Sequence, residues 1–489
     1  MLTKRLTFIF LAILLILLSI VCFYFYTNQV KKTDTLFTLL PSSETGVDFV
    51  NKLPVNVMNN DNVLSSQYYY NGGGVALGDI NNDGLVDIYF TANKSSNKLY
   101  LNMGKMRFKD ITKEAGVGSN QFSTGAVFGD INNDGFLDLY VCNSGPSKSI
   151  KKLVNQLYIN QKDGTFKEMA SQYNVNDPNH STQASFFDYD ADGDLDLYIM
   201  NHSILFQEKA EDVRKEINDK KKLMRLSGRL LQNNNGTFID ITKKAGLLRH
   251  AYGLGLSISD INSDGYPDIY IANDFSIPDF FYINNGDGTF TDKQKELTRQ
   301  IAWFGMGTDI ADINNDGFLD IGVLDMAAND HVRSKTFMAS MNPATVDYYV
   351  NTLKYPHQFM FNTLQLNNGD NTFSNIANLA GVAKTDWSWG ALFADFNNDG
   401  YKDYFISNGF RKNTLDNDFQ IKLKETKRLL KGKLDRKIRE ELYEEMPEIK
   451  LPNKLFINNQ NLKFNDIGDE QGLHQPSFSN GAAYADLDN

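Results

Sequence analysis

A nine-residue string rich in aspartate and glycine recurs six times in this 489-residue sequence, and no other feature constrains the fold as strongly. The copies occupy residues 79–87, 130–138, 188–196, 260–268, 312–320 and 395–403. Each keeps Asp at positions 1, 5 and 9 and Gly at position 6, and a seventh copy begins at Asp486. Repetition of this kind indicates an array built from one small supersecondary unit, here with a core of about 50 residues.

The segments around each string have the character of β-strands. A glycine-rich apolar run precedes the string, as in 72–78, and a run of β-branched and aromatic residues follows it, as in 88–93. Further on, the pattern Asn-x-Leu-Tyr-x-Asn followed by Gly-x-x-Phe predicts a second hairpin, as in 155–166. Four short strands per unit are typical of a propeller blade.

These strings and their flanks resemble the FG-GAP/VCBS repeat family, which includes the integrin α-chain head and cartilage acidic protein-like proteins. The resemblance is closest to bacterial surface proteins in which the repeats precede an ASPIC/UnbV-type C-terminal domain. It implies an all-β fold, and we predict a seven-bladed β-propeller over residues 44–489 with a truncated last blade. Residues 44–50 would form an outer strand that closes the ring, because Gly46 and Val47 match the Gly-Val after outer strands elsewhere.

Three long insertions interrupt the repeats near residues 201–228, 325–360 and 409–452. We expect them at the end of the ring opposite the aspartate-rich strings, where second strands lead into third strands. The first and third are predicted to be charged helices, and 422–445 carries an apolar stripe at helical spacing. Such a stripe either docks on the propeller or binds a partner helix.

The aspartate-rich strings also predict metal sites. Side-chain oxygens at positions 1, 3, 5 and 9 and a backbone carbonyl at position 7 form an oxygen-only donor set, which suits Ca²⁺. An EF-hand would carry Glu at position 12, whereas these strings have an apolar residue there and lead into a strand. One isolated copy would equally fit an ordinary hairpin turn, but six copies in register favour calcium.

In the resembling family these positions bind Ca²⁺, so we predict about six structural Ca²⁺ sites. The predicted ligands are Asp79, Asn81, Asp83, Leu85 and Asp87; Asp130, Asn132, Asp134, Phe136 and Asp138; Asp188, Asp190, Asp192, Asp194 and Asp196; Asp260, Asn262, Asp264, Tyr266 and Asp268; Asp312, Asn314, Asp316, Phe318 and Asp320; and Asp395, Asn397, Asp399, Tyr401 and Asp403.

The net charge bears on the choice of partner, and the predicted calcium sites bear on the compartment. The net charge of −11 argues against nucleic acid, and six bound Ca²⁺ ions would bring the chain close to neutral. Extracellular calcium modules bind at about 10⁻⁴ to 10⁻³ M, which requires a calcium-rich exterior or periplasm. The sequence therefore predicts an extracytoplasmic location, at the cell surface or in the periplasm.

The N-terminus predicts how the chain is held there. After residues 1–5, residues 6–26 carry no charge and are long enough to cross a membrane as a transmembrane or signal-anchor helix, which a linker at 27–43 would join to the propeller. Lipid attachment at Cys22 is the alternative, although Val21 is bulky for such a signal. Only Cys22 and Cys142 occur, so no disulfide framework is expected.

The residue eight positions before each string, at the entry to the innermost strand, is aromatic or histidine in six of seven cases. We predict that Tyr252, Trp303, Phe304, Trp387 and Trp389 surround a central funnel that stacks sugars or holds a protein loop. The alternative is that these rings only fill the space between blades.

These features lead to an expectation about function. The sequence has no H-E-x-x-H, G-x-S-x-G, P-loop or Rossmann motif, so catalytic residues are not predicted. We expect a non-enzymatic, calcium-stabilised module that binds a protein or glycan at the cell surface. The alternatives are a polysaccharide-processing enzyme and a structural spacer for a further C-terminal domain.

Overall fold

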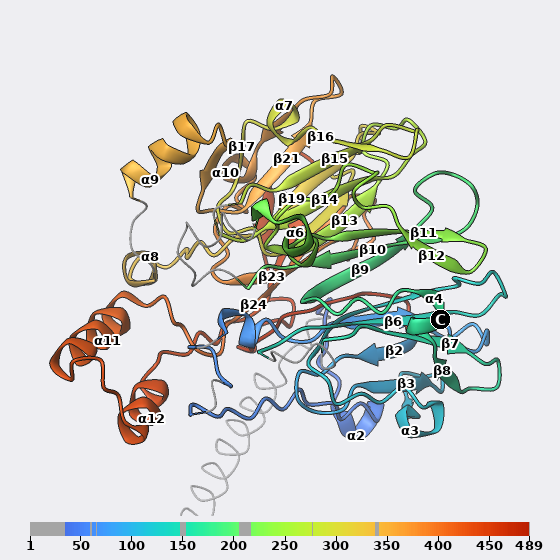
Figure 1. Cartoon of the computed structure of the whole chain (residues 1–489), viewed down its shortest axis with the longest axis horizontal. Helices are drawn as coiled ribbons and strands as arrows, with labels where there is room; N and C mark the ends of the chain where they lie inside the picture. The colour runs from blue at the N-terminus through green and yellow to red at the C-terminus, as the bar shows by residue number, and fades with distance from the viewer. Residues whose placement is uncertain are drawn as a thin grey trace, which may run out of the picture.

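The computed structural model describes residues 35–58, 61–64, 66–146, 153–204, 217–275, 277–337 and 342–488 (Figure 1). These residues include six antiparallel four-stranded sheets, each formed by strands in chain order. The predicted all-β fold of repeated four-stranded units is confirmed. The sheets consist of β1 (Val75–Gly78), β2 (Asp87–Phe90), β3 (Lys98–Asn102) and β4 (Phe108–Asp110); β5 (Ser123–Gly129), β6 (Asp138–Asn143), β7 (Gln156–Asn160) and β8 (Phe166–Glu168); β9 (Ser181–Phe187), β10 (Asp196–Asn201), β11 (Arg229–Asn234) and β12 (Thr237–Asp240); β13 (Gly253–Ser259), β14 (Asp268–Asn273), β15 (Phe280–Asn284) and β16 (Phe290–Asp292); β18 (Thr308–Ala311), β19 (Asp320–Val323), β21 (Thr363–Asn367) and β22 (Phe373–Asn375); and β23 (Ser388–Ala394), β24 (Asp403–Asn408), β25 (Lys454–Asn458) and β26 (Phe464–Asp466).

The first strands of successive sheets lie side by side, β1 beside β5 and so on through β9, β13, β18 and β23. The glycines of these strands are needed because the backbones approach closely. A Cβ on Gly125 would lie 2.6 Å from the carbonyl oxygen of Thr182, and one on Gly307 would lie 1.9 Å from that of Trp389. The glycine-rich runs before the strings are therefore a packing feature of adjacent inner strands.

The hydrophobic core lies between consecutive sheets. Tyr89 and Leu99 of the first sheet pack with Leu139 and Val141 of the second, and equivalent clusters join each later pair. The second strands β6, β10 and β14 are buried along their whole length because each is covered on both faces. This double burial explains why these strands are continuous runs of β-branched and aromatic residues rather than alternating ones.

Residues 477–488 lie between the last sheet and the first. Ser407 donates its hydroxyl hydrogen to the carbonyl oxygen of Asn480 at 2.5 Å, and a Cβ on Gly481 would lie 2.9 Å from the carbonyl oxygen of Gly73. A cavity of about 430 Å³ is lined by residues of all six first strands and by residues 480–482. The inner strands and this segment therefore surround one central space.

In four of the sheets, an asparagine of the third strand donates a hydrogen bond to the string of the preceding sheet. The amide nitrogen of Asn160 donates to the carbonyl oxygen of Ile80 at 2.8 Å, and Asn458 contacts Ile313 in the same way at 2.7 Å. Equivalent bonds join Asn233 to Ile131 and Asn284 to Tyr189. In the first sheet Asn102 makes this bond to Leu487, 385 residues away in the chain, so residues 486–488 occupy the place of a preceding string.

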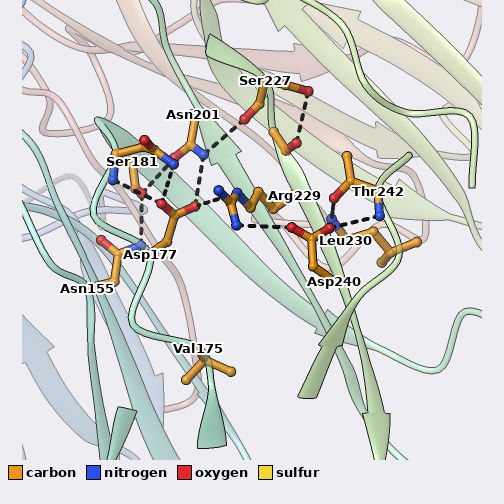
Figure 2. A network of polar contacts seen from close by, with 12 residues as sticks. Asn155, Val175, Asp177, Ser181, Asn201, Ser227, Arg229, Leu230, Asp240 and Thr242 are labelled. Carbon is orange, nitrogen blue, oxygen red and sulfur yellow. Dashed lines mark hydrogen bonds and ion pairs between the residues drawn. The ribbon is translucent and has the colours of Figure 1, made fainter. Parts of the chain in front are cut away.

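A polar network joins the second and third sheets (Figure 2). Asn155 donates to Ser181 Oγ at 2.8 Å, which donates to Asn201 Oδ1 at 2.7 Å, and Asn201 donates to Asp177 Oδ2 at 3.1 Å. Burial raises the pKa of Asp177, and Arg229 Nε lies 3.4 Å from its carboxylate. The network therefore holds a buried carboxylate against one cation.

Short helices follow the fourth strands, namely α3 (Thr112–Ala115), α4 (Ala170–Tyr173), α7 (Gln294–Leu297) and α10 (Ala377–Ala380). The prediction of an outer strand at 44–50 is wrong. Residues 42–45 form a helix of the same kind, α2 (Ser42–Thr45), and Gly46 ends it with a φ of +79°. The Gly-Val pair at 46–47 therefore marks a helix end, as Gly116 does after α3.

The insertions leave the sheets after the second strands and carry their own short elements. They contain α6 (Lys220–Leu226), α8 (Arg333–Thr336), α9 (Pro343–Asp347), the π-helix at Tyr348–Thr352, α11 (Asn417–Leu429) and α12 (Arg436–Glu444). Strand β20 (His357–Phe359) pairs in parallel with β17 (Gln300–Ala302). Figure 1 shows α8, α9, α11 and α12 together on the left of the sheets.

The helical prediction for 422–445 is only partly right. The helix breaks between α11 and α12, where Lys431 and Gly432 have φ values of +50° and +77° and Asp435 caps α12 through the Ile438 N–H. Leu429 of the expected docking stripe is 74% exposed, whereas Leu442 is buried. A single continuous stripe is therefore absent from this insertion.

The predicted membrane segment at 6–26 lies outside the described residues, as do Cys22 and most of the predicted linker. In the part of the chain that the structure describes, no helix has the length and apolar character to cross a membrane.

Candidate functional site

The six aspartate-rich strings fold into loops of one conformation between the first and second strands of each sheet. The residue at position 4, for example Asn82, has a φ near +59°, and Gly84 at position 6 has a φ of +86°. In every loop the position-6 N–H donates to Oδ2 of the position-1 aspartate at 2.8–3.0 Å. The position-5 and position-7 N–H groups also point inward, as Asp83 and Leu85 show.

The ninth aspartate of each loop is buried at the start of the second strand. Its Oδ2 accepts from the position-2 N–H at 3.0–3.3 Å, and its Oδ1 accepts from a third-strand N–H at 2.7–3.0 Å. Burial raises the pKa of Asp138 to about 7 and that of Asp87 to about 6. A cation beside these carboxylates would offset the cost of burying their charge.

The position-5 N–H donates to Oδ1 of the position-1 aspartate in every loop, and in five loops also to Oδ1 of the position-3 asparagine. In four loops the position-3 asparagine lies within hydrogen-bond distance of the position-5 aspartate, for example Asn81 Nδ2 and Asp83 Oδ2 at 2.9 Å. Among the described residues, three carboxylates come within 4.8 Å of one another only in the third loop. Whether these side chains and the position-7 carbonyl bind metal stays a prediction.

The third loop has the densest carboxylate set. Oxygens of Asp188, Asp190 and Asp196 all lie within 4.8 Å of one another. One buried oxygen of Asp190 and one of Asp194 accept no hydrogen bond from the described residues. Unsatisfied, mutually repelling oxygens of this kind fit a hard divalent cation such as Ca²⁺.

A second candidate site is a cavity of about 250 Å³ on the insertion side of the sheets. We call it the aromatic pocket, and its walls include Tyr68, Asp274, Phe275, Phe304, Trp387, Trp389 and Phe410. Trp387 stacks on Phe410 with ring centroids 4.0 Å apart, and Trp389 Nε1 donates to the Gly409 carbonyl at 2.8 Å. These contacts fix the rings in place before any ligand arrives.

Three of the five predicted ligand residues line this pocket, namely Phe304, Trp387 and Trp389. The other two lie behind it. Tyr252 packs against Phe275 at 5.3 Å between centroids, and Trp303 packs against Tyr349 at 5.8 Å. Both alternatives for these aromatics therefore occur, since some rings line a cavity and some fill space between neighbours.

Sequence reasoning missed Tyr68, Asp274, Phe275 and Phe410, which come from connections outside the repeat pattern. One signal was present: Asp274 follows the last asparagine of β14, where Ser144 and Gly409 follow the equivalent asparagines in two other sheets. Its carboxylate is buried, and this burial raises its pKa to about 7.

A polar cluster next to the aromatic pocket contains two histidines. His202 Nε2 lies 2.9 Å from Ser144 Oγ, and His180 Nδ1 lies 3.3 Å from the same oxygen. Burial lowers the pKa of His202 to about 3 and that of His180 to about 4, so both rings are neutral. The edge of Tyr68 packs on His202, which places the cluster behind the pocket wall.

Comparison with known sequences matches FG-GAP-like repeats to residues 79–141, 143–199, 260–323 and 345–406, together half of the chain. Cartilage acidic protein 1 of Mus musculus is 32% identical over 143 residues, which cover 27% of this chain and 21% of the relative. The Homo sapiens protein is 24% identical over 200 residues, covering 35% and 30%. The chain thus spans less than a third of the length of these curated relatives.

Two solved structures are similar at low identity. One is an Agrocybe aegerita lectin described as recognising non-reducing terminal N-acetylglucosamine, with a TM-score of 0.40, 14% identity and coverage of 83% of this chain and 84% of that one. The other is the V. cholerae biofilm matrix protein Bap1, with a TM-score of 0.32, 13% identity and coverage of 65% and 41%. Likenesses this distant say nothing of function here.

The matched repeats begin or end within the four-stranded sheets, and all six loops of the matched type have the same backbone conformation. With half of the sequence matched, this chain belongs to the FG-GAP-like repeat family.

Proposed function

We propose that this chain is a calcium-stabilised, seven-bladed β-propeller that binds a protein or glycan ligand at the cell surface. The aromatic pocket is the observation that carries the binding role, because it is a preformed concave site lined by large aromatic rings. The pocket lies beside the insertions, which contribute Met326 and Leu415 to its walls.

The seven-bladed ring is supported by residues 477–488. They fill the space between β23 and β1, and Asn102 holds Leu487 as the asparagines of later sheets hold the preceding string. Six sheets and this segment around one central cavity fit a ring of seven units.

Calcium is supported by the donor set of the loops. Side-chain oxygens at positions 1, 3, 5 and 9 would hold the ion, and the ion would neutralise the buried ninth carboxylate. The role is structural, because the loop aspartates are committed to backbone N–H groups of their own hairpin. Weak sites of this kind fill only where calcium is plentiful, which favours the extracytoplasmic location, with residues 6–26 as the anchor.

The test is a retention assay on immobilised envelope glycans and surface proteins. The purified 489-residue chain, in detergent and millimolar calcium, is compared with Trp389→Ala and with Trp303→Ala, a tryptophan outside the aromatic pocket. We expect a retained ligand whose binding is lost in Trp389→Ala and kept in Trp303→Ala. Retention equal in all three proteins, or none, would overturn the pocket assignment, and release of cleaved glycan would favour the enzyme alternative.

A further inference from the structure

The aromatic pocket contains one charged group, the carboxylate of Asp274, among the described residues that line it. Asp274 is 4% exposed. Its Oδ1 accepts from the Phe275 N–H at 2.7 Å, and its Oδ2 accepts from the Tyr68 hydroxyl at 3.2 Å. Among the described residues, no Lys, Arg or His pairs with it, and another carboxylate, Asp325, adds to the burial that raises its pKa.

A buried carboxylate without a cation is costly, since removal from water disfavours its charged form. Of the other buried carboxylates described above, Asp177 has Arg229 beside it, while the ninth aspartate of each loop accepts two backbone N–H groups, as Asp87 does. The carboxylate of Asp274 instead borders the cavity of the aromatic pocket. Asp274 therefore has no cationic partner among the described residues, and a cationic ligand in the cavity would supply one.

The rings around this cavity suit a particular kind of cation. The ring centroid of Phe275 lies 6.3 Å from that of Tyr68 and 6.2 Å from that of Phe304, and Trp387, Trp389 and Phe410 form a second group of rings in the lining. Aromatic faces attract a positive charge through their quadrupole, most strongly when water is excluded.

Phe275 takes up a strained backbone conformation at this wall, with a φ of +59°. A bulky aromatic residue in the left-handed region is an outlier, and such strain concentrates at binding sites. Its N–H bond to Asp274 belongs to the same turn, so the strained backbone positions both the ring and the carboxylate.

A primary ammonium is strongly hydrated and needs three hydrogen-bond acceptors when it leaves water. The lining is mainly aromatic rings, methionines and leucines, and its polar side chains besides Asp274 are those of Gln67, Tyr68, Asn71 and Thr414. A quaternary ammonium donates no hydrogen bond and loses little on leaving water, while its charge still pairs with a carboxylate.

On the basis of the ligand pocket proposed above, we propose that the aromatic pocket binds a trimethylammonium group, with the rings as its cage and Asp274 as its counter-ion. Free choline and a phosphocholine headgroup share this chemistry. The cavity of about 250 Å³ is suited to such a compact group rather than to an extended chain.

The test measures binding of choline to the full chain by calorimetry and by the fluorescence of Trp387 and Trp389. The matched probe is 3,3-dimethylbutan-1-ol, the uncharged carbon analogue of choline. We expect choline to saturate one site and the analogue to bind at least tenfold more weakly. Equal affinity for the two probes, or no binding of choline or phosphocholine, would overturn the proposal. Choline and phosphocholine run in parallel distinguish the free cation from the headgroup, and binding of either one supports it.

Variants separate the carboxylate from the fold. Asp274→Asn keeps the shape and removes the charge, so choline affinity should fall at least tenfold. Asp279→Asn is the control, because Asp279 is also buried in the fourth sheet but does not line the pocket. Unchanged affinity in Asp274→Asn would contradict the counter-ion role, and the comparison of probes on the unmodified chain stands even if that variant misfolds. Retention of a glycan or protein through Trp389 without choline binding would reject this inference and leave the proposed function intact.

Discussion

The hydroxyl of Tyr270 donates a hydrogen bond to Asp279 Oδ2 at 2.8 Å, in a position where four other sheets carry asparagine. In the first and second sheets the direction is reversed, since Asn97 and Asn155 donate to the tyrosine oxygens. Asp279 Oδ1 keeps the second shared contact, accepting from the Asn273 N–H at 2.9 Å. The fourth sheet thus buries a carboxylate at a position where an asparagine amide would make the same two contacts.

Asp279→Asn should stabilise the protein in a pH-dependent way. Burial raises the pKa of Asp279 to about 7, above its unfolded value. The folded state therefore binds more protons than the unfolded state between about pH 4 and pH 7, and the ionised side chain costs most above pH 7. We expect the variant to raise the free energy of unfolding by about 2 kcal/mol at pH 8 and to change it little at pH 4.5.

Denaturant unfolding at both pH values, in saturating calcium, measures this difference. The reciprocal variant Asn155→Asp should lose stability at pH 8. An equal gain at both pH values in Asp279→Asn would show that packing, and not ionisation, is responsible.

Removal of calcium should lower the melting temperature, because binding to the folded state alone stabilises by mass action. At a free calcium concentration about tenfold above Kd, each loop contributes about 1–2 kcal/mol. Asp134→Asn removes one ligand carboxylate of the second loop and should reproduce a fraction of the loss caused by chelator. The measurement is thermal unfolding with calcium or EGTA.

Asp163→Asn is the control for that variant. Asp163 is an exposed residue of the turn between β7 and β8, where it accepts from Thr165, and it lies outside the six aspartate-rich loops. It should not alter the response to calcium. A melting temperature insensitive to EGTA would count against structural calcium altogether.

Asp190→Asn should have opposite effects with and without calcium. The third loop carries an aspartate where the other five carry asparagine, and its oxygens lie close to those of Asp188 and Asp196. Loss of one charge weakens calcium binding at this loop but relieves repulsion when the ion is absent.

Calorimetry should show one weakened site, and unfolding in EGTA should show a more stable variant. Asn132→Asp, the reciprocal change in the second loop, should do the reverse. Destabilisation of Asp190→Asn under both conditions would mean that its contact with Gln232, at 2.8 Å, matters more than the charge.

Arg229→Met should destabilise the join between the second and third sheets (Figure 2). Arg229 lies between Asp177 and Asp240, and its removal leaves the buried Asp177 without a cation. We expect a loss of about 3 kcal/mol in the free energy of unfolding, measured with urea. Arg436→Met, which breaks an exposed pair with Glu440, should change little. Similar effects of the two variants would show that the Asp177 charge is not the cause.

The loops and hairpins were predictable because their determinants are local. Gly84 and its equivalents must take a positive φ, and aspartates spaced two apart meet within one turn. The helix at 42–45 was missed because four residues carry too little periodicity to identify a helix. The break at Lys431 and Gly432 was missed because apolar residues recur at helical spacing on both sides of it.

The aromatic pocket could be predicted only in part. Trp387 stands at the position eight residues before a string that is aromatic in most repeats, and Trp389 lies two residues after it, so alignment of the repeats pointed to this segment. Tyr68 and Asp274 are 206 residues apart and meet only because the sheets are arranged around one centre. No pattern within a repeat records such a contact.

The bond from Asn102 to Leu487 also bears on how a disturbance would travel. In an open row of sheets, a loop that loses its ion could affect the rest of the row through a single boundary on each side, and the effect would stop at the outermost sheet. In the proposed closed ring every loop would have a neighbour in both directions, so strain from one damaged loop would be shared by two routes. Such an arrangement favours melting as one unit over fraying from an end.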